Sequence, residues 1–352
     1  MNSIIKRFSL PKVTRLVLAL NISLSIIVFY YKSQAYAQLT SSGKPATTEE
    51  VDFAGLSIPF FQLIPSSVIK NPWTLVISSF LESTILGFFF TVANTVVSIR
   101  YFEKVWGTKE TIKFLLIVST LTNLLTAVFL TLWKSNTADQ SILNKSASGC
   151  FSLILAYVVA FKQHLPEHNL IFFKGAFHLR VKHVPFISLI VLLVLPFITK
   201  SYYPTLNSLL CFGISWTYLR FFQSMILEPL IPLTSSTTAS SNANNGDTTN
   251  DISDNLQFGV HRVQGDASDT FAFAYFFPDV IHPIVSPVFN AIYQIMASIG
   301  VIHGFNDEDV AQSNERAIRR STARAGRSSS SNIAERRRQV ALKVLEERIG
   351  TS

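Results

Sequence analysis

The sequence predicts an all-α, multi-span membrane protein, with a bundle of six helices and a cytosolic C-terminal region. Three observations lead to this fold class. The 352 residues are 48% hydrophobic, include 29 Phe and have a mean hydropathy of +0.33, which is too apolar for an ordinary soluble domain. Charges gather in short loops and in the C-terminal tail. The charge-poor runs between them approach the ~20 residues that a helix needs to cross a bilayer.

The expected spans differ in length. Three of them hold only about 16 to 18 residues, and flanking Lys and Arg side chains can extend such short spans by reaching the headgroups. Short spans favour the thinner bilayers of the early secretory pathway. The six predicted spans cover residues 14–31, 73–99, 114–133, 146–161, 184–199 and 202–219.

The first apolar run has two interpretations. It follows four basic residues and precedes the small-residue stretch "SQAYAQ", so it could be a signal peptide that is cleaved after Ala35 or Ala37. We favour a retained anchor, because the bundle has an even number of spans only when this run is kept.

The distribution of Lys and Arg predicts the orientation. Twelve lie in the N-terminal segment and in the second and fourth connecting loops, whereas six lie in the other loops. Because the richer side faces the cytosol, both termini are expected to be cytosolic.

Composition then divides the chain. Residues 1–12 form a cytosolic N-terminus, 13–229 the membrane domain, 230–270 a flexible polar linker, 271–305 an amphipathic interfacial segment and 306–352 a basic tail with a short terminal helix. Residues 280–302 are uncharged and could form a seventh span. We favour an interfacial helix, because Pro283 and Pro287 interrupt the start of this run.

The basic tail offers a binding surface for a cytosolic partner helix or for anionic lipid headgroups. A simple solvated tail is the alternative interpretation. No nucleic-acid binding is expected, because no aromatic residues alternate with the basic ones. The predicted partner-binding residues are Arg336, Arg337, Arg338, Leu342, Leu345 and Ile349.

Five motifs, "NPWTLVISSFLES", "IRYFEKVWGTKETIKFLL", "LAYVVAFKQHLPEHNL", "SWTYLRFF" and "FAFAYFFPD", resemble the transmembrane protein 115 family of rhomboid-like Golgi proteins. The resemblance implies a rhomboid-like bundle in the Golgi membrane, with the ER membrane as the alternative. It also implies a role in retrograde Golgi-to-ER transport and glycosylation homeostasis. The implied partners are a Golgi tethering complex and membrane-protein clients, and homo-oligomerisation stays open.

Most motif residues have structural interpretations, such as the start of a helix at Pro72 and Trp73 or a tight connection at Gly107. Glu82 differs, because a carboxyl group within a span is costly unless it is paired or near water. It could form a polar site in a cavity, or it could hydrogen-bond between packed helices. The motif residues are Pro72, Trp73, Glu82, Glu103, Trp106, Gly107, Lys162, Gln163, Ser215, Trp216, Tyr218, Arg220, Phe277 and Pro278.

Ser148 occupies the position of a rhomboid nucleophile in the sequence Ser-Ala-Ser-Gly, at 146–149. In an active rhomboid the base is a His on span six, but residues 202–219 contain no His. The positions that resemble the polar row of span two hold Glu82, Gly87 and Thr91, none of which is His or Asn. We therefore predict a rhomboid pseudoprotease with no catalytic residue. The alternatives are an intramembrane serine protease that uses Ser148, and a derlin-like client adaptor of the ER.

No cofactor is expected. His164 and His168 are four residues apart, but Pro166 between them argues against a single helical face that could hold a metal. Cys150 and Cys211 both lie within predicted spans, so they indicate no disulfide framework.

Overall fold

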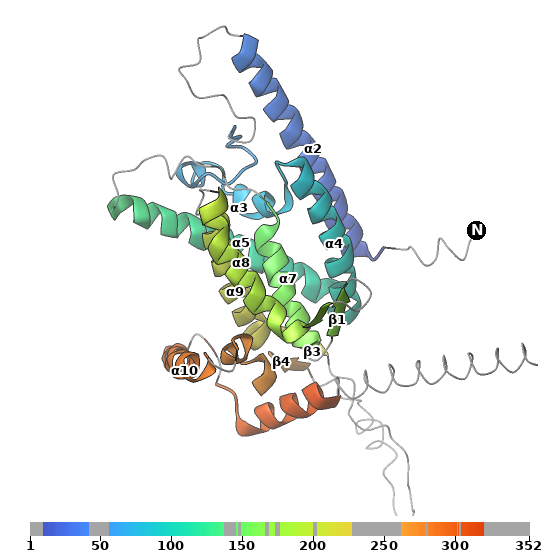
Figure 1. The fold of residues 1–352 in the computed structure, drawn as a ribbon, viewed down its shortest axis with the longest axis vertical. Coiled ribbons are helices and arrows are strands. Elements are labelled where there is room, and N and C mark those ends of the chain that lie inside the picture. Colours follow the sequence, from blue (N-terminus) through green and yellow to red (C-terminus); the bar gives the residue numbers. More distant parts are fainter. Residues whose placement is uncertain are drawn as a thin grey trace, which may run out of the picture.

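The structure is a computed structural model that describes residues 10–41, 56–136, 146, 149–165, 169–172, 177–199, 203–226, 262–278, 281–300, 302 and 304–319. Helices dominate it (Figure 1). Among the described residues, three helices are long and apolar enough to cross a membrane, over Lys12–Ser41, Ile85–Trp106 and Thr108–Lys134. The chain is thus a mostly helical membrane protein. Ser148, His168 and the predicted tail residues at 336–349 lie outside the described residues.

The bundle is built around α7 (Phe151–His164), which contacts α5 (Thr108–Asn136), α8 (Val184–Thr199) and α9 (Tyr203–Thr217). The first helix, α2 (Lys12–Ser41), lies along α4 (Ile85–Trp106) at the edge of the bundle (Figure 1). Small residues allow α7 its central position, since Ala156 and Ala160 are fully buried.

The prediction of one continuous span over residues 73–99 is wrong. The chain forms a short helix α3 (Thr74–Ile77) and a 3₁₀ turn η2 (Ser78–Phe80), leaves helical geometry over residues 81–84, and enters α4 only at Ile85. The Thr84 hydroxyl caps α4 by accepting the Gly87 N–H at 3.3 Å. Glu82 therefore lies in a non-helical segment, not inside a helix, and its carboxylate is directed at α7.

Other boundaries shift less. The predicted span 184–199 coincides with α8, while α2 and α5 extend beyond the runs predicted at 14–31 and 114–133. The helix predicted from residue 146 begins only at Phe151. At its C-terminal end, α9 continues into a π-helical turn, η5 (Tyr218–Phe222). Short 3₁₀ turns also form at η1 (Pro65–Ser67) and η4 (Val181–His183).

Two small antiparallel sheets were not predicted. One pairs β1 (Asn169–Phe172) with β2 (Phe177–Arg180), and the other pairs β3 (Ser224–Ile226) with β4 (Arg262–Gln264). The second sheet joins the end of α9 to the C-terminal segment. Residues 262–270, which the sequence assigned to the linker, thus include a strand and the buried Asp266, Ala267 and Ser268.

The chain continues through two 3₁₀ turns, η6 (Asp269–Phe271) and η7 (Phe273–Phe276), to α10 (His282–Ser298). A further helix covers residues 307–319. We call residues 262–278 the closing segment, because it packs over the end of the bundle where α7 and α9 finish. Phe271 and Phe276 anchor it, since both are 1% exposed and belong to the main core.

Candidate functional site

The start of α7 is held by the carboxylate of Glu82. Glu82 Oε1 accepts the backbone N–H of Cys150 at 2.8 Å and the Thr91 hydroxyl of α4 at 2.9 Å. The backbone N–H of Glu82 itself donates to Ser25 Oγ of α2 at 3.0 Å. The segment 81–84, in which Leu81 and Glu82 are buried, thus joins three helices. A carboxylate at the N-terminus of a helix satisfies a donor that the helix cannot pair and interacts favourably with the helix dipole.

Two glycines make room for this carboxylate. A Cβ on Gly87 would lie 2.9 Å from Glu82 Oε2, and a Cβ on Gly149 would lie 3.3 Å from Glu82 Oε1. Gly149 has a φ of 130°, which strongly favours glycine, and its N–H donates to the Ser78 carbonyl at 3.2 Å. The structure therefore brings together Glu82, Gly87 and Thr91, the positions that the sequence compared with the polar row of a protease. Gly149, which directly follows Ser148, joins them.

Across from α7, α9 presents small buried side chains. Ser208, Cys211 and Ser215 are fully buried. Ser215 is engaged within its own helix, because its hydroxyl donates to the Phe212 carbonyl at 3.0 Å. These groups pack and hydrogen-bond, but they are poor acceptors for a serine proton.

Gly213 of α9 faces a different neighbour. It lines an apolar pocket of about 480 Å³ between α5 and α9, together with Ile117, Leu121 and Leu209. A Cβ on Gly213 would meet no heavy atom within 4 Å, so its surroundings are open.

Asn123 is a polar centre that the sequence analysis missed. Its amide nitrogen lies 2.7 Å from the Leu75 carbonyl, 3.1 Å from Ser78 Oγ and 2.8 Å from Ser79 Oγ. This side chain of α5 thus holds the α3–η2 segment that leads to Glu82. An amide in the middle of an otherwise apolar run was the available signal, because such groups usually hydrogen-bond between helices.

Glu103, at the other end of α4, caps a second helix. Its two carboxylate oxygens accept the N–H groups of Val13 and Thr14 at 2.9 Å, and the Thr14 hydroxyl at 3.0 Å. These are first-turn donors of α2. Gly107, with a φ of 84°, then ends α4, and Thr108 begins α5. The sequence predicted a connector here, and the structure adds the attachment of the first helix.

The motif at the end of α7 contacts the closing segment. Lys162 Nζ donates to the Tyr275 carbonyl at 2.6 Å and lies 3.5 Å from the centre of the Phe276 ring. Its neighbour Gln163 donates to Gln223 Oε1 at 3.1 Å. Lys162 is 2% exposed, so its ammonium group is a buried contact rather than a free surface charge.

Trp106 lies near this contact. Its indole N–H donates to His164 Nε2, and its ring stacks on Phe102 at 4.5 Å. His164 is therefore engaged in packing between α4 and α7. In the part of the chain that the structure describes, no group of three His, Cys, Asp or Glu residues could hold a metal.

The motif at the end of α9 binds the closing segment from the other side. Trp216 donates to the Phe271 carbonyl at 3.0 Å, and Arg220 Nη1 donates to the Ser268 carbonyl at 2.5 Å. Burial lowers the pKa of the Arg220 guanidinium, while the nearby Asp266 and Asp269 carboxylates and Tyr293 raise it. Most of the motif residues to which the sequence analysis gave only a structural role thus lie together, at the end of the bundle that the closing segment covers.

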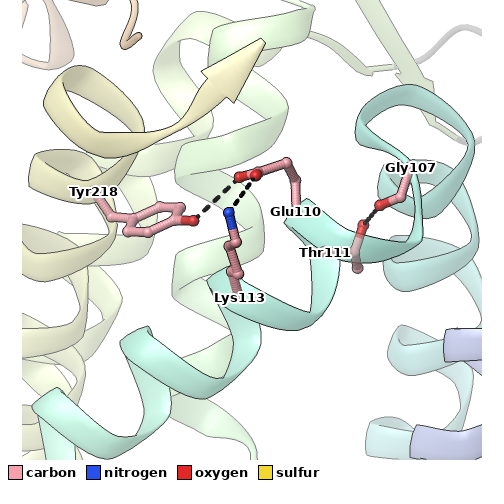
Figure 2. Close-up of polar contacts among 5 residues, drawn as sticks. All are labelled: Gly107, Glu110, Thr111, Lys113 and Tyr218. Carbon is pink, nitrogen blue, oxygen red and sulfur yellow. Dashed lines mark hydrogen bonds and ion pairs between the residues drawn. The ribbon is translucent and has the colours of Figure 1, made fainter. Parts of the chain in front are cut away.

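Tyr218 connects this end to α5 (Figure 2). Its hydroxyl donates to Glu110 Oε2 at 3.4 Å, and Lys113 Nζ pairs with Glu110 Oε1 at 2.9 Å. In the same turn of α5, the Thr111 hydroxyl donates to the Gly107 carbonyl at 2.9 Å. These contacts fix the first turn of α5 against η5.

The remaining motif residues start helices. The Trp73 indole N–H donates to the Phe60 carbonyl at 2.9 Å, and the Pro72 carbonyl accepts the Leu75 N–H at 3.2 Å just before α3. Before α10, the Pro278 carbonyl accepts the Ile281 N–H at 2.9 Å. The Phe277 ring lies 5.9 Å from that of Phe186 in α8.

Comparison with known proteins identifies the family. The model of one protein family, described as "Eukaryotic integral membrane protein (DUF1751)", matches residues 15–351 of this chain. The chain is also 30% identical over 349 residues to "Transmembrane protein 115 homolog" of Saccharomyces cerevisiae, which covers 97% of this chain and 93% of that protein. The chain belongs to the transmembrane protein 115 family. This confirms the family resemblance of the five motifs.

Two further relatives extend the transmembrane protein 115 family assignment. "Rhomboid-like protein 19" of Arabidopsis thaliana is 26% identical over 306 residues, or 86% of this chain and 84% of its own length. "Transmembrane protein 115" of Mus musculus is 25% identical over 287 residues, or 79% of this chain and 67% of its own. The protein is therefore an integral membrane protein of a rhomboid-like family.

Proposed function

We propose that this protein is a catalytically inactive, rhomboid-like protein of the Golgi membrane. It acts in retrograde Golgi-to-ER transport and glycosylation homeostasis by binding membrane-protein clients and a cytosolic tethering complex. The location and the transport role rest on the family resemblance. The loss of catalysis rests on the geometry at the start of α7.

The hydrogen bond between Glu82 and Cys150 is the observation that carries the proposal. The first N–H groups of a helix are natural donors to an anion, and acyl transfer needs such donors for the oxyanion of its tetrahedral intermediate. Here the N–H of Cys150, two residues after Ser148, already donates to Glu82 Oε1 at 2.8 Å. An oxyanion formed at this place would find this N–H already engaged by Glu82.

Span six also offers no histidine that could act as the general base. Residues 202–219 contain no His, and the buried side chains that α9 directs into the bundle include Ser208, Cys211 and Ser215. Loss of a general base typically costs a factor of about 10² to 10⁴ in rate. The core of the bundle is thus built for packing rather than for catalysis.

We place α2, α4, α5, α7, α8 and α9 across the membrane as six spans with both termini in the cytosol. The excess of Lys and Arg on one side supports this orientation. Epitope tags before Lys6 and after Ile349 should both be accessible to protease in sealed microsomes, whereas a tag beside Lys44 should be protected. Protection of the C-terminal tag would show that the span count is odd.

Cells that lack the gene provide the test of function. Re-expressed wild-type protein should co-localise with Golgi markers and restore both the lectin-binding profile of the cell surface and retrograde transport. The Ser148→Ala variant should restore them equally well. Restoration that needs Ser148 would favour the protease interpretation, and residence in the ER would favour a derlin-like adaptor.

A further inference from the structure

The helix α10 carries an apolar stripe that no described part of the chain covers. Its isoleucines at 284, 292, 295 and 299 are 71%, 46%, 56% and 67% exposed, respectively, although residues 280–302 contain no charge. At about 100° per residue, these four positions lie within one quarter of the helix surface. Exposed isoleucines in such a stripe indicate a contact rather than free solvation.

The rest of α10 is of two kinds. Phe289 and Tyr293 face the bundle, where the Phe289 ring stacks on Phe273 at 3.8 Å and the Tyr293 ring on Phe221 at 6.0 Å. The exposed Asn290, Gln294 and Ser298 follow a third side, roughly 120° away from the isoleucine stripe. The free surface of α10 is therefore divided into an apolar half and a polar half.

The position of α10 indicates what covers the apolar half. In Figure 1, α10 is seen nearly end-on beside the lower ends of α8 and α9, whose axes run along the picture, so it lies across these helices. Phe277, just before α10, contacts both Phe273 and Phe186 at the start of α8. The outward side chains of α8 that follow, including Ile187 and Ile190, are exposed and apolar, as expected for a surface in contact with lipid. Helix α10 therefore begins shortly after a contact with α8, whose outer face is apolar.

We infer that α10 lies in the plane of the membrane, with Ile284, Ile292, Ile295 and Ile299 inserted at the boundary between headgroups and acyl chains. The leaflet is the one at the end of the bundle that carries Lys162 and Arg220. Asn290, Gln294 and Ser298 face water. A helix with one apolar and one polar side adopts this position in bilayers. Because α10 is also packed on the closing segment, lipid contact and closure of the bundle stabilise each other.

Fluorescent labels on α10 test this inference in the full-length protein reconstituted in phosphatidylcholine nanodiscs. Single cysteines replace Ile292 or Ile295, and matched controls replace Asn290 or Gln294, with an environment-sensitive fluorophore on each. The native Cys150 and Cys211 are 2% and 0% exposed, and protein without an added cysteine measures their background labelling. Each label is then quenched from lipid by a doxyl group near the headgroup and from water by iodide.

We expect labels at 292 and 295 to be quenched several-fold more by doxyl lipid, and several-fold less by iodide, than labels at 290 and 294. Equal quenching by iodide at all four positions would overturn the inference. Protection of 292 and 295 from both quenchers would overturn it too, because protein rather than lipid would then cover the stripe. This result does not depend on Golgi function or on catalysis.

A pair of substitutions supplies an independent readout. Ile292→Ser with Ile295→Ser should reduce doxyl quenching of a label at position 299 at least two-fold. Asn290→Ala with Gln294→Ala should leave that quenching unchanged. If both pairs leave it unchanged, insertion of the stripe is excluded.

Discussion

Glu82 and Cys150 are 68 residues apart in the sequence, and the carboxylate of one accepts the backbone N–H of the other at 2.8 Å. This bond lies at the break between η2 and α4 and holds the start of the central helix α7. At the far end of α4, Glu103 makes the equivalent bonds to Val13 and Thr14 of α2. The helix α4 is thus bracketed by two buried carboxylates, each of which caps a neighbouring helix.

The first prediction concerns Glu82. Glu82→Ala leaves the Cys150 N–H without an acceptor and should lower the free energy of unfolding by about 1–3 kcal/mol. Glu82→Gln keeps an acceptor and should cost less. Because Cys150 and Cys211 are the two cysteines of the chain and both are buried, their reaction with a fluorogenic maleimide during heating reports unfolding. Unfolding of Glu82→Ala at the wild-type temperature would contradict the capping role.

A second prediction compares two glycines. Gly149→Ala places a Cβ 3.3 Å from Glu82 Oε1 at a φ of 130°, so it should destabilise the protein by about 1–3 kcal/mol. Gly213→Ala is the control, because it lies in α9 with no heavy atom within 4 Å and should be neutral or stabilise by up to ~1 kcal/mol. The same thiol assay measures both variants. Equal melting temperatures would show that close packing at Gly149 is unimportant.

The third prediction concerns attachment of the closing segment. A Cβ on Gly265 would lie 2.2 Å from the Arg220 carbonyl oxygen, a backbone atom that cannot move away cheaply. Gly265→Ala should therefore detach β4 from β3 and accelerate amide hydrogen exchange across residues 262–278 by ten-fold or more. Gly300→Ala is the matched control: its φ of 78° is nearly that of Gly265, at 79°, but nothing lies within 4 Å. If Gly300→Ala accelerates amide exchange across residues 262–278 as much as Gly265→Ala does, the clash with the Arg220 carbonyl is not responsible. If neither variant accelerates it, the closing segment does not depend on Gly265.

The fourth prediction tests the proposed role of the tail. Deletion of residues 334–352 should spare membrane insertion, because the bundle holds the protein, but should weaken recruitment of the tethering complex and slow retrograde transport. Replacement of Leu342, Leu345 and Ile349 by Ala should reproduce much of this loss if a helix binds in a groove. Charge reversal at residues 336–338 should do so if electrostatics dominates. Unchanged co-purification and transport after the full deletion would assign the transport function to the bundle.

Hydrophobic runs predicted which parts of the chain form bundle helices, because a helix in lipid must be apolar over its length. The run at 184–199 matches α8 in both bounds. The break at residues 81–84 escaped prediction because the partners that hold it, such as the N–H of Cys150 and the hydroxyl of Ser25, lie far away in the sequence. A local sign was present, since Thr84 directly precedes the apolar start of α4 and caps it.

The site residues were harder to interpret than to find. The motifs containing Lys162, Trp216 and Arg220 were recognised in the sequence, but their common role depends on contacts with residues 262–278, which follow a long polar stretch. Periodicity along a helix does not tell which distant segment will pack on it. Gly265 had no interpretation from its neighbours, because its need for glycine arises from the Arg220 carbonyl.

The most direct test of the central claim is labelling of Ser148 by a fluorophosphonate probe in native membranes. Wild-type protein and the Ser148→Ala variant are compared at equal expression, beside an active rhomboid protease as a positive control. We predict no labelling that depends on Ser148, because Glu82 occupies the Cys150 N–H and span six provides no histidine base. Labelling of the wild type that disappears in Ser148→Ala would contradict the account and identify this bundle as a protease.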